Sequence, residues 1–230
     1  MQKAAAPDLR RRALVSLLRF TVVLAVMIFL PAWSLTYWQG WLFWLNFIAC
    51  MIVMTLYFLT HDPALVGRRM SAGPTAEKEA SQKRIQLFAS IIVCALFVVP
   101  ALDHHFGWST VPAWVVILGN VLVIAGFWMM FVVFRENSFA SAIIEVDAEQ
   151  RVISTGPYAL VRHPMYSGAL VMFTGVPLAL GSWWGLLLII PLLAILIVRL
   201  LDEERYLLKN LPGYEDYSRN VPHRLVPGVW

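Results

Sequence analysis

Six long apolar runs, separated by polar segments, constrain this chain more than any other feature. Most of them are close to the roughly 20 residues that an α-helix needs to cross the hydrocarbon core of a bilayer. Only 14% of the residues are charged, whereas soluble domains carry about a quarter. The sequence therefore predicts an all-α polytopic membrane protein with about six hydrophobic spans (five to six). The runs are residues 14–33, 41–59, 85–102, 113–134, 166–180 and 185–201.

Two of these runs need separate comment. The first is longer than the apolar core of a typical signal peptide, and no small-residue cleavage site follows it, so we expect it to span the membrane. The fifth is short for a span, so we expect it to tilt or to enter the bilayer only partly. Together with the sixth run it forms a predicted helical hairpin.

The distribution of basic residues predicts the topology. With six spans, all 18 Lys and Arg fall on one side or at its membrane edge, and the opposite loops, 34–40, 103–112 and 181–184, contain none. The positive-inside rule makes the basic side cytoplasmic, so we expect both termini and the active face there, in a bacterial inner membrane. An aromatic belt at the other interface supports this orientation. Its members are Trp33, Trp38, Trp41, Trp44, Trp108, Trp114, Trp183 and Trp184.

The polar segments between the runs are mostly predicted to be connectors. Residues 61–84 and 135–161 are the longest, and residues 103–112 form a short predicted turn that holds His104 and His105. Within the second connector, residues 142–146 and 151–153 flank polar residues 147–150, a pattern that favours a small hairpin. The tail is predicted to be helical to about Leu211, where Pro212 and Gly213 break it.

Several kinds of site are disfavoured by the residue pattern. Cys50 and Cys94 both fall inside apolar runs, which argues against a disulfide framework or a thiolate metal site. His104 and His105 have no carboxylates near them in sequence beyond Asp103, so we expect no metal. Glycine-rich phosphate loops and a Gly-x-Ser-x-Gly motif are absent. The net charge of +4 fits topology signals better than nucleic-acid binding.

Candidate chemistry instead converges on the basic side. Ionisable residues cluster where the fourth run ends, where the fifth begins and where the sixth ends. Such a cluster at membrane depth is a functional candidate, although helix-end charges also simply extend toward water. Pro164 suits the first turn of a helix and disfavours a helical conformation for His163, which places the imidazole near a helix N-terminus. The cluster comprises Arg135, Glu136, Asn137, Arg162, His163, Tyr166, Arg199, Asp202, Glu203 and Glu204.

These residues form part of a two-part motif. The first part reads Gly-Pro-Tyr-x-x-Val-Arg-His-Pro-Met-Tyr-x-Gly over residues 156–168, and the second combines Glu203-Glu204 with Pro-Gly-Tyr-x-x-Tyr over residues 212–217. The motif resembles the isoprenylcysteine carboxyl methyltransferase family, whose relatives include the phospholipid N-methyltransferases. The resemblance covers about residues 130–230. It implies one integral membrane domain over residues 1–230, with N-terminal spans in 1–130 and a methyltransferase-like catalytic core in 131–230.

The resemblance also implies a cofactor and its pocket. The family uses S-adenosylmethionine, and the matching positions are expected to line a pocket formed by the C-terminal hairpin and the cytosolic tail. Arg162 or His163 is expected to hold the cofactor's carboxylate, and a Glu its amino group or ribose. Glu203, Glu204 and Arg199 are the expected catalytic residues. The expected cofactor-binding set is Tyr158, Arg162, His163, Pro164, Tyr166, Gly168, Glu203, Glu204, Tyr214 and Tyr217.

The predicted function is methyl transfer from S-adenosylmethionine to a lipophilic or membrane-embedded acceptor, a carboxylate or an amine, at the cytosolic face. The expected partners are a lipophilic small molecule or lipid substrate and membrane lipids, with no nucleic acid and no metal. The residues leave two alternatives open. One is an NADPH-dependent sterol-type membrane reductase, which would also place a nucleotide cofactor on the cytosolic side. The other is a non-catalytic membrane-integral component.

Overall fold

The computed structural model describes residues 7–70, 80–143 and 150–230, and it is helical in its regular elements. Long apolar segments become helices because only a helix or a closed barrel satisfies every backbone polar group in lipid. The elements are α1 (Pro7–Ala32), α2 (Trp38–His61), α3 (Pro63–Met70), α4 (Ala80–Phe106), α5 (Ala113–Glu136), η1 (Gly156–Ala159), α6 (Pro164–Ala179), η2 (Trp184–Leu188), α7 (Ile189–Asn210) and α8 (Tyr214–Asn220).

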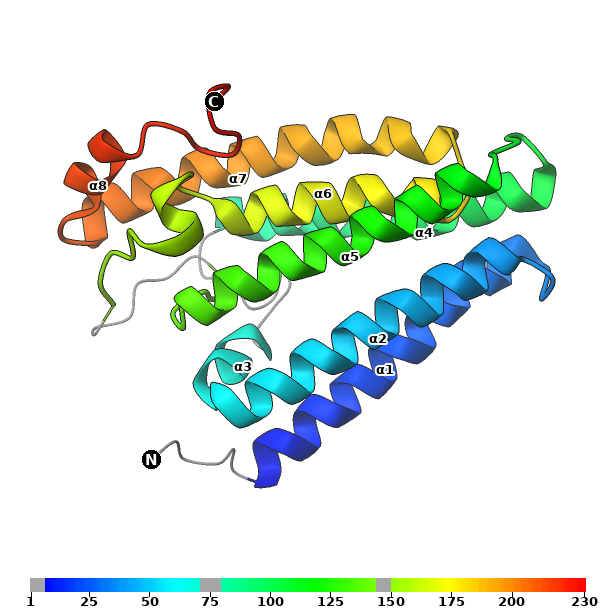
Figure 1. The fold of residues 1–230 in the computed structure, drawn as a ribbon, viewed down its shortest axis with the longest axis horizontal. Helices are drawn as coiled ribbons and strands as arrows, with labels where there is room; N and C mark the ends of the chain where they lie inside the picture. The colour runs from blue at the N-terminus through cyan, green and yellow to red at the C-terminus, as the bar shows by residue number, and fades with distance from the viewer. Residues whose placement is uncertain (1–6, 71–79, 144–149) are drawn as a thin grey trace.

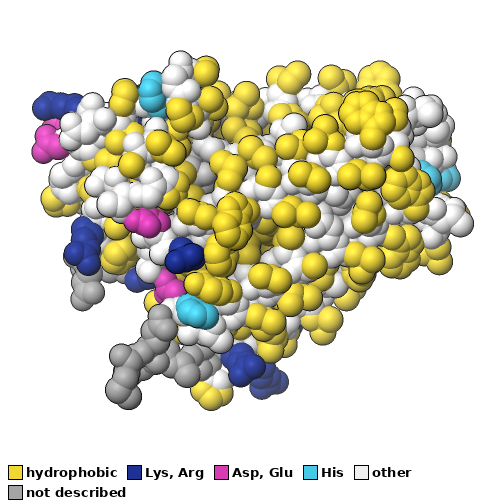
Figure 2. All heavy atoms as spheres, viewed as in Figure 1, with side chains coloured by type: hydrophobic (Ala, Val, Ile, Leu, Met, Phe, Trp, Pro, Cys, Tyr) yellow, Lys and Arg dark blue, Asp and Glu magenta, His cyan; other side chains and the backbone are white. Residues whose placement is uncertain are grey.

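Five helical segments in the described part of the chain are long and apolar enough to cross a membrane, namely α1, α2, α4, α5 and the segment Trp184–Asn210; α6 is a shorter apolar helix. The predicted all-α polytopic fold is therefore confirmed. The long helices run along the length of the molecule, and α3 and α8 lie at the same end (Figure 1). On the face shown in Figure 2, charged side chains gather at that end and hydrophobic side chains cover most of the rest.

Helix α6 packs against α5 with almost no side-chain layer between them. A Cβ added at Gly119 would lie 2.2 Å from the backbone nitrogen of Ala179, and one at Gly126 would lie 2.6 Å from that of Met172. Backbones can approach this closely only where a side chain is missing, so these glycines set the register of the two helices. The start of α6, which carries the site, is thereby held beside the end of α5.

Helix α6 is shorter than α5 because it ends early, at the end of the molecule away from the site. Ala179 lies opposite Gly119, whereas α5 begins at Ala113, six residues earlier, or about 9 Å along a helix axis. Polar groups of the turn that follows form hydrogen bonds with other parts of the protein. Tyr37 donates its hydroxyl to the carbonyl of Leu180, and the hydroxyl of Ser182 donates to Asp103 over 2.5 Å.

Three expectations about connectors need revision. Residues 61–84 contain helix α3, which begins at Pro63 and whose first turn is capped by Asp62, since the Leu65 amide donates to its carboxylate over 3.0 Å. Helix α4 continues past Pro100 and through His104 and His105 to Phe106, so these two histidines are helical and not in a turn. Helix α4 also begins at Ala80, before the apolar run.

The expected hairpin in the second connector lies largely beyond the described residues, since 144–149 fall outside them. Its described part, residues 142–143 and 150–153, has no strand. The break expected in the tail is confirmed, because α7 ends at Asn210 and Gly213 takes a left-handed conformation with φ 83° before α8.

Candidate active site

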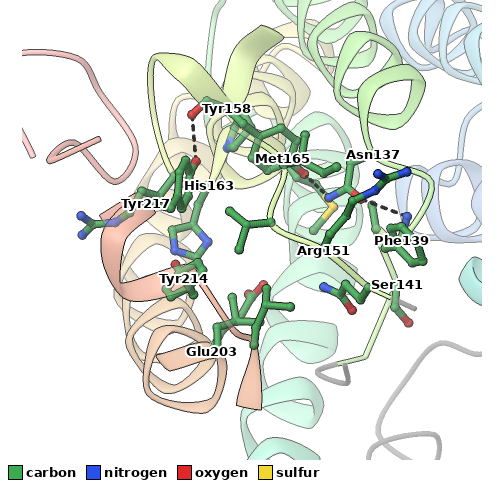
Figure 3. Close-up of a pocket in the computed structure, with 18 of the residues that line it drawn as sticks. Asn137, Phe139, Ser141, Arg151, Tyr158, His163, Met165, Glu203, Tyr214 and Tyr217 are labelled. Carbon is green, nitrogen blue, oxygen red and sulfur yellow. Dashed lines mark hydrogen bonds between the residues drawn. The ribbon is translucent and has the colours of Figure 1, made fainter. Parts of the chain in front are cut away.

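A pocket opens between the start of α6, the end of α7, helix α8 and the segments on either side of residues 144–149. Figure 3 shows His163, Tyr214 and Glu203 on one side of it and Arg151 and Phe139 on the other. Its wall therefore combines residues that are far apart in the sequence. The lining residues are Asn137, Phe139, Ala140, Ser141, Ile143, Gln150, Arg151, Val152, Ile153, Tyr158, Arg162, His163, Pro164, Met165, Tyr166, Glu203, Leu207, Leu211, Tyr214 and Tyr217.

The start of α6 presents His163 as the sequence predicted. Pro164 is the first helical residue, and His163 stands just outside the helix with φ −124° and ψ 60°. Its backbone amide donates to the carbonyl of Arg224 over 3.0 Å, and that of Arg162 donates to the carbonyl of His223 over 2.9 Å. The segment that carries both side chains is therefore held in place by the C-terminal residues.

Glu204 is the centre of a buried ionic cluster behind the pocket. Its Oε1 accepts a hydrogen bond from Nε of Arg162 over 2.7 Å and lies 3.3 Å from Nε2 of His163. Its Oε2 accepts from Nε of Arg224 over 2.9 Å. Because the Glu204 side chain is only 10% exposed, these contacts replace water as its solvation. Arg162 also donates to the carbonyls of Ser218 and Val221, which ties α8 to the same cluster.

Glu203, in contrast, faces the pocket. Its Oε2 accepts a hydrogen bond from the hydroxyl of Tyr166 over 2.6 Å. That hydroxyl also accepts from Nε of Arg199 over 3.3 Å, and Arg199 donates to the side chain of Gln86 on α4 over 2.9 Å. Helix α4 thus supports the pocket from behind through Arg199 and Tyr166. Glu203 is the only carboxylate among the described lining residues.

Three tyrosines close the pocket on the side of α8. The Tyr217 hydroxyl donates to the carbonyl of Tyr158 over 2.8 Å, and Asn137 donates to the Tyr158 hydroxyl over 2.9 Å. Burial raises the pKa of Tyr158 to about 12, and burial likewise raises the pKa of Tyr214 and of Tyr217. The Tyr214 hydroxyl is buried without a hydrogen-bond partner among the described residues. A buried unpaired hydroxyl is costly, so a ligand in the pocket would have a ready partner there.

The structure brings most of the predicted site residues together. Two of the remaining ones lie behind the lining, since Glu204 and Arg199 contact it through His163 and Tyr166. Gly168 lies at the α5–α6 contact, where an added Cβ would come within 3.1 Å of Met129. Those that line the pocket are Tyr158, Arg162, His163, Pro164, Tyr166, Glu203, Tyr214 and Tyr217.

Sequence reasoning missed other residues of the site. Asn137 was in the candidate cluster but not in the expected cofactor-binding set, and Arg151 and Arg224 were not selected at all. Arg151 follows a polar stretch that gave no periodic signal, and Arg224 lies beyond the last motif. No motif or spacing would have selected either one, because both contribute only through the folded geometry.

The comparison with known families bears directly on this site. Residues 114–212 match the phospholipid methyltransferase family. The match extends from the second residue of α5 to just beyond α7 and includes His163, Glu203 and Glu204. It confirms the resemblance predicted from the motif and indicates a membrane methyltransferase. A search of curated proteins finds no match.

The described part of the chain holds no cluster of metal-ligand side chains at this pocket. Among residues 7–70, 80–143 and 150–230, no three or more His, Cys, Asp or Glu side chains are grouped so that they could hold an ion. Among the described lining residues, Glu203 provides a carboxylate for a cationic group, and Arg151, Arg162 and His163 provide groups for an anion.

Proposed function

We propose that this protein transfers a methyl group from S-adenosylmethionine to a lipophilic acceptor that reaches the pocket from the bilayer. The observation that carries the proposal is the position of Glu203, His163 and Tyr214. They meet in one pocket at the ends of two apolar helices, within or next to the region that matches the phospholipid methyltransferase family. The side of the membrane is inferred from the basic residues, which place this end in the cytosol.

The residues present fit the groups of S-adenosylmethionine. Glu203 has one oxygen bonded to Tyr166 and can accept from an ammonium or a ribose hydroxyl with the other. His163 and Arg151 are placed to take the carboxylate, and the unpartnered Tyr214 hydroxyl can bond either end. The lining also has an apolar part suited to the adenine ring. It consists of Val152, Ile153, Leu207 and Leu211.

The chemistry requires alignment above all. The cofactor supplies a methyl group on a positively charged sulfur, and an in-line attack needs the acceptor atom held opposite that sulfur. The α5–α6 contact and the Glu204 cluster hold the pocket wall rigid, which serves such alignment. A carboxylate acceptor needs no base. An amine acceptor must lose a proton, and Glu203 and His163 are the lining groups that can take it.

The geometry distributes the expected catalytic roles unequally. Glu203 lines the pocket, whereas Glu204 is engaged by Arg162, His163 and Arg224. A carboxylate already held by charged donors is a poor proton acceptor. We therefore assign the acid–base role to Glu203 or His163, a structural role to Glu204, and support of Tyr166 to Arg199.

Ligand binding separates this proposal from the two alternatives. The purified protein in detergent is incubated with labelled S-adenosylmethionine or with NADPH. We expect S-adenosylmethionine to bind and NADPH not to compete. Binding of NADPH instead would favour the reductase, and binding of neither would favour a non-catalytic component. The family match supports the first outcome.

The acceptor is then identified by incubation with labelled S-adenosylmethionine and a membrane lipid extract. We expect the label in a lipid or another lipophilic product. The resemblance to isoprenylcysteine carboxyl methyltransferases does not extend to the N-terminal spans, so a prenylated substrate has no specific support in the sequence. Efficient methylation of a water-soluble acceptor, without competition from any lipophilic one, would contradict entry from the bilayer.

A further inference from the structure

The C-terminal segment, residues 221–230, folds back over the start of α6 and pairs with it. Its carbonyls at His223 and Arg224 accept the backbone amides of Arg162 and His163 over 2.9 and 3.0 Å. The next carbonyl, that of Leu225, accepts the hydroxyl of Ser167 over 2.7 Å. The segment is therefore registered residue by residue against the part of the chain that carries His163.

We call residues 221–230 the C-terminal clasp. A turn within the clasp holds the side chain of Arg224. The amides of Arg224, Leu225 and Val226 all donate to the carbonyl of Trp230, over 2.9, 3.0 and 3.2 Å. The Arg224 guanidinium lies 5.0 Å from the centre of the Trp230 ring, a cation–π contact. Trp230 in turn packs against the hydrophobic core.

The clasp delivers Arg224 to the oxygen of Glu204 that faces away from Arg162 and His163. Arg224 Nε donates to Glu204 Oε2 over 2.9 Å, while Arg162 and His163 share Oε1. The carboxylate plane is consequently fixed from both sides. If Arg224 were absent, Oε2 would lose its side-chain donor among the described residues and the carboxylate could rotate, which would release the imidazole of His163.

We propose that Arg224 is a positioning residue for the methyl transfer, acting through Glu204 to hold His163 in the geometry that binds the cofactor. This inference rests on the proposed function, because the role given to Arg224 is defined by the binding of S-adenosylmethionine in that pocket. The clasp lies outside the matched residues 114–212, so the family match does not cover it. No side chain of the clasp lines the pocket, so its effect on the pocket is indirect.

The test compares Arg224→Met with Arg219→Met. Arg219 pairs with Glu215 on the surface of α8, where both side chains are about 70% exposed, so it is a matched control in the same region. We expect Arg224→Met to raise the dissociation constant and KM for S-adenosylmethionine by roughly tenfold to a hundredfold, with a smaller change in kcat. Arg224→Lys should restore part of the affinity, and Arg219→Met should change it less than twofold.

A double-mutant cycle shows whether Arg224 acts through Glu204. If it does, Arg224→Met should weaken binding far less in a Glu204→Gln background than in the wild type. Additive effects, or an Arg224→Met variant that binds like the wild type, would overturn the proposal.

Amide hydrogen exchange measured without ligand tests the clasp independently of S-adenosylmethionine binding. Arg224→Met should speed exchange at the amides of Arg162 and His163, which bond to the clasp, and leave the middle of α5 unchanged. Unchanged exchange at both amides would refute the clasp even if S-adenosylmethionine binds. Failure of the wild type to bind S-adenosylmethionine would instead refute the proposed function.

Discussion

The adjacent residues Glu203 and Glu204 on α7 should differ in how much a change to glutamine lowers the stability of the protein. In Glu204→Gln, the amide has one oxygen where the carboxylate has two, so its NH₂ group must face a guanidinium or His163. Removing one charge from a buried ion pair costs about 3–5 kcal/mol. Glu203 has only the neutral Tyr166 hydroxyl as its described donor, and a glutamine oxygen can accept the same hydrogen bond. We expect Glu203→Gln to change stability by about 1 kcal/mol or less.

Cofactor affinity should distinguish the two variants by whether its loss is accompanied by a large loss of stability. Glu203→Gln removes the negative charge from the pocket wall, so the affinity for S-adenosylmethionine should fall by roughly tenfold to a hundredfold, equivalent to about 1.5–3 kcal/mol. Glu204→Gln should also lose affinity, because it frees His163, but unlike Glu203→Gln it should lose much of its stability as well.

The assays are equilibrium unfolding in mixed micelles and calorimetric titration with S-adenosylmethionine. Glu215→Gln serves as the control, because its ion pair with Arg219 is exposed and worth about 0–1 kcal/mol. The reasoning is refuted if Glu204→Gln destabilises the protein no more than this control does. It is equally refuted if Glu203→Gln is as destabilising as Glu204→Gln.

Four further outcomes are expected. Gly126→Leu should destabilise the protein by at least about 1–3 kcal/mol in the same unfolding assay, since its Cβ would lie 2.5 Å from that of Met172. Because the native pKa of Tyr158 is raised to about 12, the native state keeps a proton that the unfolded state loses, so stability should fall as the pH rises from about 10 to about 12, and less steeply in Tyr158→Phe. Reporters fused at Gly107 and at the C-terminus should report opposite sides of the membrane, and the same side for both would contradict the six-span topology. The rate of methylation should rise with pH for an amine acceptor and be flat above about pH 6 for a carboxylate.

The sequence was sufficient for the framework because the bilayer leaves few choices. Apolar length alone located the spanning helices, and the pair His163-Pro164 predicted where α6 begins. Helix ends were less accurate. Helix α4 extends beyond its apolar run at both ends, because the polar side chains that flank the run tolerate a helical backbone.

Roles within the site were harder to predict than its members. The sequence treated Glu203 and Glu204 alike, yet they point to different surroundings because neighbouring helical residues are about 100° apart. Which of them meets the pocket depends on where Arg162 and Arg224 lie in space. Pairings of that kind join residues 20 to 42 positions apart, and no local pattern records them.

The polar turn after α6 has a consequence for how the protein enters the membrane. From Pro164 to Val198 the chain contains no Asp, Glu, Lys, Arg or His, and the large side chains exposed between the two helices are Trp183, Trp184 and Leu187. In the proposed topology, the insertion machinery therefore has to translocate no charged side chain to place this hairpin. The buried hydroxyl of its turn, that of Ser182, donates to Asp103 on α4, an earlier segment of the chain. The α6–α7 hairpin can thus insert into the membrane as an apolar unit after the preceding helices and then pack against them.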